Sequence, residues 1–130
     1  MNSREHHIAV TAPSQIQQIV DLYFQGVFHG DTVLLTSLFD VHAQVYGVVD
    51  DQPYHKTAAD YIAGVGKRQS PAALGAPYRM KLLAVDILGP IATVRLHSPM
   101  LGFDYHLYLT LSERDDGWKI VNKTFTAPAF

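Results

Sequence analysis

The chain has 130 residues, of which 48% are hydrophobic and 17% are charged, and its formal net charge is −2. This length and composition are typical of one globular domain and exclude a disordered chain. The slightly acidic balance gives no electrostatic reason to expect nucleic-acid binding, and the lack of cysteine excludes disulfides and zinc–thiolate sites.

The first segment, residues 1–12, is expected to form a polar arm or a short edge strand that becomes apolar at Ile8–Val10. It has no apolar core of a signal peptide, and no apolar run in the chain approaches the roughly 18 residues of a membrane span. We therefore expect a cytoplasmic protein that contacts no membrane. Residues 13–130 are expected to form one domain.

Three helices are predicted along the first half of the chain. Ser14 with Gln17 has the pattern of a capping box, and the apolar residues that follow at spacings of three and four predict an amphipathic helix ending at Gly30. Asp31 is the expected N-cap of a second, shorter helix. Thr57 begins the third helix, which precedes a loop over residues 69–77.

Strands are predicted mainly in the second half, over residues 42–49, 54–56, 78–88, 91–98, 105–111 and 118–125. The last two form a hairpin around Asp115–Gly117. Neither face of this hairpin is cleanly polar, so we expect both faces to be covered, one by helices and the other by a second subunit or a ligand. Strict alternation of the return strand separates two sets of side chains: Trp118, Ile120, Asn122 and Thr124 on one face, and Lys119, Val121, Lys123 and Phe125 on the other.

Arg95 and His97 share one face of a predicted strand, and Val94 and Leu96 share the other. In one interpretation the cationic face points inward and binds an anionic or carbonyl ligand, with His97 as a general base. In the other, which the burial preference of apolar side chains favours, Val94 and Leu96 form the core and the cationic face points outward.

Two further polar groups have a functional and a structural interpretation. Asp104 and His106 share a face with Tyr108; they form an orienting carboxylate–imidazole pair or simply a solvated surface. Lys123, between apolar neighbours, either extends to the rim of a pocket or binds a ligand carboxylate. No histidines have metal-binding spacing on a predicted helix, and the His6-His7 pair is weak evidence, so we expect neither a metal nor a cofactor.

The pattern of residues resembles the NTF2-like (cystatin-like) superfamily, in particular its SnoaL-like and putative lumazine-binding branches. The matching positions are Tyr23-Phe24, Gly30-Asp31, Leu38-Phe39, Ala43–Gly47, Tyr105, Leu109–Leu111 and Asp116–Phe125. The resemblance implies an α+β fold in which a curved antiparallel sheet wraps three N-terminal helices into a cone with an internal pocket, and a homodimer formed through the outer face of the sheet. Where the branch often has an acidic residue, before the Leu-Thr-Leu segment, this chain has Leu107, which lowers the expectation of acid–base chemistry.

Two functions are compatible with these residues and with the resemblance. The first is a small-molecule-binding domain without an assigned reaction, whose pocket takes a flat apolar or aromatic ligand against tyrosine and phenylalanine rings. The second is a small cofactor-independent isomerase, cyclase or dehydratase with His97 or Asp104 as its base. The residues expected to line the pocket are Tyr23, Tyr46, Tyr61, Arg95, His97, Tyr105, Lys123 and Phe125.

Overall fold

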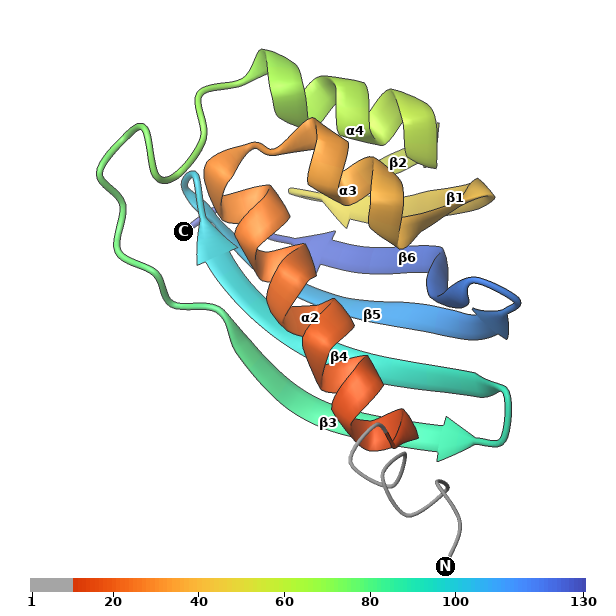
Figure 1. The fold of residues 1–130 in the computed structure, drawn as a ribbon. Coiled ribbons are helices and arrows are strands. Elements are labelled where there is room, and N and C mark those ends of the chain that lie inside the picture. The colour runs from red at the N-terminus through yellow and green to blue at the C-terminus, as the bar shows by residue number, and fades with distance from the viewer. Residues whose placement is uncertain (1–10) are drawn as a thin grey trace, which may run out of the picture.

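The computed structural model describes residues 11–130, which form an α+β fold with three helices on one face of a curved, unclosed sheet of six strands (Figure 1). The expected arm over residues 1–12, including Ile8–Val10 and the His6-His7 pair, lies almost entirely outside the described residues. The elements are the helices α2 (Ala12–His29), α3 (Thr32–Leu38) and α4 (Ala58–Lys67) and the strands β1 (Phe39–Val49), β2 (Gln52–Thr57), β3 (Lys81–Leu88), β4 (Ile91–Met100), β5 (Phe103–Arg114) and β6 (Gly117–Ala127).

Helix α2 begins earlier than its capping pattern indicated. Its N-cap is Thr11, and Pro13 lies in the first turn, where its missing N–H costs no hydrogen bond. Ser14, the predicted N-cap, is already helical, and its hydroxyl donates to the carbonyl of Thr11 at 3.0 Å. The predicted end is confirmed, because Gly30 has a left-handed φ of 67° that a residue with a Cβ adopts only at a cost.

The other two predicted caps are present in the structure. The carboxylate of Asp31 accepts a hydrogen bond from the backbone N–H of Leu34 at 3.0 Å, and the hydroxyl of Thr57 accepts one from Asp60 at 3.2 Å. Both satisfy N–H groups that have no partner within the helix. None of the three helices in the described part of the chain is long and apolar enough to cross a membrane.

The sheet has the strand order β2-β1-β6-β5-β4-β3. It is antiparallel, as expected, except for the pair β1–β6, which is parallel. The parallel pair places β1, the first strand in the chain, beside β6, the last strand, in the middle of the sheet. Helix α2 contacts β3 and β6, whereas α4 contacts β1 and β2, so the three helices cover the concave inner face (Figure 1).

The central strands show which side chains point inward. Val94 and Leu96 on β4 are fully buried, and Leu107, the partner of Leu96 across the ladder on β5, is 2% exposed. Arg95 is exposed and His97 is half-buried on the opposite, outer face. The outward orientation of the cationic face is therefore the observed one, and the alternative in which Arg95 and His97 face the pocket is wrong.

Strand β6 does not alternate as the sequence suggested. The register between β5 and β6 shifts after the Thr110–Asn122 pair, and Leu111 already pairs with Ile120, which leaves Val121 as an extra residue. This β-bulge reverses the alternation. As a result Ile120 before it and Lys123 after it both face inward, although strict alternation placed these two side chains on opposite faces of the sheet.

Candidate functional site

A cavity of about 210 Å³ lies between α4, the strands β1, β2 and β6, and the end of the β4–β5 hairpin. Its volume is below the roughly 300–1,000 Å³ of pockets that enclose drug-sized molecules, so its size suits a small ligand. The residues that line it are Val49, Tyr54, Lys56, Tyr61, Gly64, Val65, Arg68, Met100, Tyr105, Lys123 and Phe125. None of them is an aspartate or a glutamate, whereas three are cationic.

Lys123 is the polar centre of this cavity. Its side chain is buried, with the residue only 2% exposed, and its Nζ donates a hydrogen bond to Tyr61 Oη at 2.8 Å. The ammonium nitrogen also lies 4.2 Å from the ring centroid of Tyr61 and 5.1 Å from that of Phe125. Burial, and next the charge of Arg68, hold the pKa of Lys123 well below its usual value, because a charged group without a counter-ion is unstable away from water.

Arg68 brings a second positive charge to the same cavity. It follows directly after α4, as the C-cap residue of that helix, and its guanidinium atoms Nε and Nη2 are buried without a hydrogen-bond partner among the described residues. Buried donors are nearly always paired in folded proteins, and a guanidinium matches a carboxylate with two parallel hydrogen bonds. The cavity thus holds unpaired donors of the kind that recognise an anion.

Two buried tyrosines extend the polar network beneath Lys123. Tyr23, on α2, is hydrogen-bonded to Tyr61, on α4. Burial raises the pKa of Tyr61 to about 12 and raises that of Tyr23 well above its ordinary value. Both hydroxyls are therefore protonated near neutral pH. They act as hydrogen-bonding groups and not as bases.

Aromatic rings form the apolar wall of the cavity. Phe125 packs against Tyr54, with ring centroids 5.3 Å apart, and against Tyr105, with centroids 5.7 Å apart. Phe125 can lie there because its partner across the parallel ladder is Gly47, where a Cβ would clash with the Phe125 ring. A planar ligand would meet ring faces and edges on this side of the cavity.

Four of the residues expected at the pocket line the cavity: Tyr61, Tyr105, Lys123 and Phe125. Tyr23 is buried behind Tyr61 and does not reach the lining. Tyr46 lies on the outer face of the sheet and is 45% exposed. Arg95, which is exposed, and His97, which is half-buried, lie on the same outer face. The cavity therefore contains none of the groups that the sequence proposed as a catalytic base.

Sequence reasoning missed Arg68 and Tyr54, both of which line the cavity. Arg68 follows the glycine-containing end of α4, where a cation is ordinarily solvated, and nothing in the local pattern indicates its burial. Tyr54 faces inward as the cross-strand partner of Gly47, a relation that depends on the β1–β2 register.

His97 and Asp104, the two candidate bases, lie together outside the cavity. His97 Nε2 is hydrogen-bonded to Asp104 Oδ1 at 2.6 Å, and His106 Nε2 lies 3.6 Å from Asp104 Oδ2. The hydrogen bond from His97 is the largest of the effects that lower the pKa of Asp104. The expected carboxylate–imidazole arrangement thus includes two imidazoles, one from each neighbouring strand.

Comparison with known proteins identifies this architecture. The model of the family described as putative lumazine-binding matches residues 11–126, which is nearly the whole described part of the chain. The chain belongs to this family. A search of curated proteins found no match.

Several solved structures of NTF2-like proteins have the same fold as this chain. An NTF2-like protein of unknown function from Silicibacter pomeroyi DSS-3 superposes with a TM-score of 0.80 at 19% identity, covering 98% of this chain and 99% of its own. One from Shewanella baltica OS155 gives 0.77 at 20% identity, with 92% and 98% covered. One from Methylobacillus flagellatus KT gives 0.78 at 21% identity, with 89% and 91% covered. At these identities the likeness shows the fold alone.

Proposed function

We propose that this domain binds a small organic carboxylate with a planar body in the inner cavity. The observation that carries the proposal is the convergence of Lys123 and Arg68 on a cavity that no acidic residue lines. A carboxylate would give both groups the counter-charge that they lack, in a setting of low dielectric where such an interaction is strong. The rings of Tyr54, Tyr105 and Phe125 would pack against the body of the ligand.

The proposal refines the expectation of a flat apolar or aromatic ligand by adding a negative charge. A wholly apolar ligand would leave the buried donors of Arg68 unpaired and would cover the Lys123 ammonium without compensating its charge. The favourable hydrophobic contacts of such a ligand would be offset by the desolvation of two cations. An anionic ligand avoids this loss, so the same cavity discriminates between charged and neutral molecules of one shape.

The test compares matched probes that differ in charge. Benzoate, phenylacetate and cinnamate are each compared with the corresponding neutral amide by the shift in the thermal unfolding midpoint. A ligand at ten times its Kd stabilises the folded state by about 1.4 kcal/mol. We expect at least one carboxylate to stabilise the wild type while its amide does not, and we expect Arg68→Gln and Lys123→Met to remove the effect.

The outer-face variant His97→Gln serves as the matched control and should retain the shift. Each shift is measured against the ligand-free midpoint of the same variant, because the substitutions also change intrinsic stability. Equal stabilisation by a carboxylate and its amide, a response that survives both cavity substitutions, or no response to any of the three carboxylates would contradict the proposal.

We infer binding rather than acid–base catalysis because of where the candidate bases lie. His97 and Asp104 are on the outer face of the sheet, and neither lines the cavity. The ionisable groups in the cavity are cations and tyrosines, which favour binding of an anion over removal of a proton from carbon. An isomerase, cyclase or dehydratase of the SnoaL or ketosteroid-isomerase type remains the alternative, and turnover lost on replacing His97 or Asp104 would favour it.

We also propose that two copies associate through the outer face of the sheet. Tyr46, Thr124 and Tyr108 lie side by side on three neighbouring strands of that face, and the two tyrosines are 45% and 54% exposed. A self-complementary pairing would bury both rings about a two-fold axis. Sedimentation equilibrium should show a dimer that Tyr108→Asp dissociates, whereas Val33→Asp, at an exposed site on α3, should not. A monomeric wild type would refute this pairing.

A further inference from the structure

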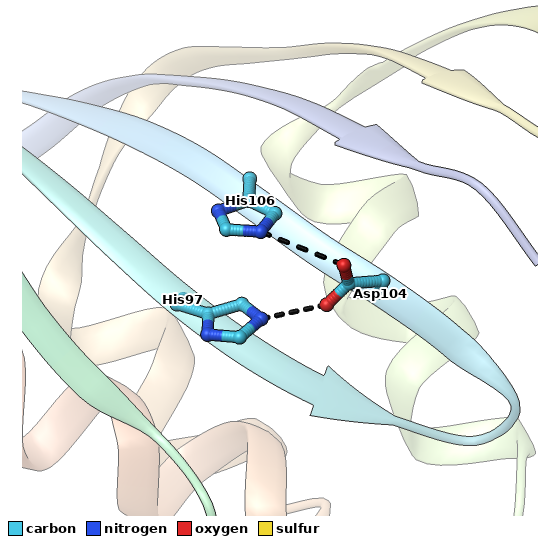
Figure 2. A group of neighbouring side chains, drawn as sticks. All are labelled: His97, Asp104 and His106. Atoms are coloured by element: carbon cyan, nitrogen blue, oxygen red, sulfur yellow. Dashed lines mark hydrogen bonds and ion pairs between the residues drawn. The ribbon is translucent and has the colours of Figure 1, made fainter. Parts of the chain in front are cut away.

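A second group of ligand-forming side chains lies on the outer face of the sheet, at the end of the β4–β5 hairpin (Figure 2). His97 is on β4, and Asp104 and His106 are on β5. His97 and His106 are directly opposite each other in the ladder, and Asp104, two residues before His106, is the diagonal neighbour of His97 on the same face. The antiparallel pairing alone therefore brings three side chains from two strands together.

The three side chains point their ligand atoms at a common point. The Asp104 carboxylate has one oxygen 2.6 Å from His97 Nε2 and the other 3.6 Å from His106 Nε2. The imidazole rings are stacked, with centroids 4.1 Å apart and planes inclined by 10°, so both Nε2 edges face the carboxylate. One ligand atom from each of the three residues lies within 4.8 Å of the other two.

We propose that His97, Asp104 and His106 form a binding site for a divalent transition-metal ion, with Zn²⁺ as the ion that fits it best. Zinc binds imidazole nitrogen and carboxylate oxygen at about 2.0–2.2 Å in tetrahedral geometry. Tetrahedral donors at such bond lengths lie about 3.3 Å from one another. His97 Nε2 lies 2.6 Å from Asp104 Oδ1 and His106 Nε2 lies 3.6 Å from Asp104 Oδ2, and one ligand atom from each of the three residues lies within 4.8 Å of the others, so side-chain rotations can bring three donors to that spacing.

The backbone beneath the site is well fixed, which favours a defined geometry over an accidental cluster. The N–H of Asp104 donates to the carbonyl of Pro128 at 2.9 Å, and Phe103 forms a bridge with Ala129. The C-terminal segment therefore holds the turn and the residue that supplies the carboxylate. A metal site is most precise when its ligands stand on such fixed elements.

The site is accessible and leaves coordination positions open. The side chains of His97, Asp104 and His106 are 29%, 34% and 44% exposed, so a metal ion and a water molecule can reach them. Two imidazoles with one carboxylate and an open position are the ligand set of several zinc and iron enzymes. Arg95, two residues from His97 on the same face, is exposed to solvent, which screens its repulsion of a cation.

No metal was expected from the sequence, because the expectation rested on histidines spaced along one helix. Here the two imidazoles are nine positions apart in the sequence and meet only through the register of the β4–β5 hairpin. The sequence spacing of the two histidines did not indicate a metal site, whereas the pairing of their strands does. The inference is independent of the carboxylate-binding cavity, since no residue of the three lines it.

The experiment is a zinc titration of the untagged full-length chain in which His6 and His7 are replaced by alanine, so that the N-terminal pair contributes no metal binding. Isothermal titration calorimetry gives the affinity and stoichiometry, and the visible absorption of Co²⁺ reports tetrahedral coordination by these ligands. We expect one Zn²⁺ per chain, and at least about tenfold weaker binding for Asp104→Asn and for His106→Gln.

His55→Gln is the matched control, because His55 is an exposed histidine on β2 whose Nε2 bonds Gln44 and not a carboxylate. It should leave the zinc affinity unchanged. Circular dichroism confirms that each variant is folded. Zinc affinity that Asp104→Asn and His106→Gln leave unchanged, a stoichiometry of one ion per two chains, or the absence of measurable binding would each overturn the proposal.

Discussion

Replacing Lys123 with methionine tests whether the cavity holds an uncompensated charge. Lys123→Met keeps the length and much of the volume of the side chain but removes the ammonium group. In the wild type that group is 2% exposed, lies near Arg68, and has no carboxylate partner among the described residues. We therefore expect the variant to be more stable than the wild type at pH 7, although it loses a visible hydrogen bond.

The magnitude follows from opposing contributions. Loss of the Lys123–Tyr61 hydrogen bond costs about 1 kcal/mol, moderated because Tyr61 retains its hydrogen bond with Tyr23. Loss of the cation–π contacts costs about 1 kcal/mol more. Removing the desolvation penalty of a buried charge returns several kcal/mol. The net expectation is stabilisation by about 1–2 kcal/mol, or a rise of about 4–8 °C in the unfolding midpoint of a chain of this size.

The pH dependence gives an independent check with a definite sign. The pKa of Lys123 is lower in the folded state than the ordinary value of 10.5 in the unfolded chain. Between these two values the unfolded chain holds one more proton, so the stability of the wild type rises with pH, by at most about 1.4 kcal/mol per pH unit. Below the folded pKa the full penalty is present. The advantage of Lys123→Met should therefore shrink as pH rises toward 10.5.

The assay is urea unfolding at several values between pH 7 and pH 10, followed by the fluorescence of Trp118, the single tryptophan. Trp118 is buried, and its indole N–H donates to Gln15 at 3.2 Å, so unfolding changes its surroundings. Lys119→Met is the control, because Lys119 lies on the same strand with its ammonium at the surface. A Lys123→Met variant that is less stable by more than about 1 kcal/mol, or whose advantage does not change with pH, would refute the reasoning.

Three further results are expected. Gly47→Ala should destabilise the fold by about 1–3 kcal/mol in urea unfolding and weaken benzoate binding, because the added Cβ displaces Phe125 from the cavity wall; unchanged binding would contradict that role of Gly47. Asp31→Ala should cost about 1 kcal/mol through the lost cap and leave carboxylate affinity unaltered in calorimetry, which checks that binding is not a mere readout of stability. Benzoate affinity of the wild type should fall as pH rises through the lowered pKa of Lys123 and the ammonium loses its proton, whereas Lys123→Met should show no such fall.

Local patterns were sufficient to predict most of the fold. The caps Asp31 and Thr57, the C-terminal Gly30 of α2, and the closing hairpin all depend on residues close together in the sequence, and each is present. The start of α2 was misplaced because Thr11 and Ser14 are both good capping residues, and the rotation of the first turn decides between them. The parallel β1–β6 pair was missed because it joins strands far apart in the chain, and nothing local encodes it.

The site was predicted less well than the fold, because the positions of its side chains depend on strand register and on packing between distant parts of the chain. Lys123 and Ile120 both point inward only because Val121 forms a β-bulge between them. A bulge leaves no clear mark in the pattern of apolar residues, so the sequence did not reveal it. Arg68 was missed because its burial depends on how the end of α4 packs over the sheet. His97, Asp104 and His106 became a group only when the register of β4 and β5 was known.

The distribution of unfavourable features argues that the cavity is kept for function. The ammonium of Lys123 and two guanidinium nitrogens of Arg68 are buried without an acidic partner among the described residues, and Gly47 gives β1 no side chain to pack. All three features contact or shape the same space, since Lys123 and Arg68 line the cavity and Gly47 leaves room for the Phe125 ring in its wall. Local rules in natural proteins are broken mainly where binding or catalysis requires it. A substitution that removes one of the two buried positive charges, such as Lys123→Met, should therefore raise stability and lower ligand affinity together.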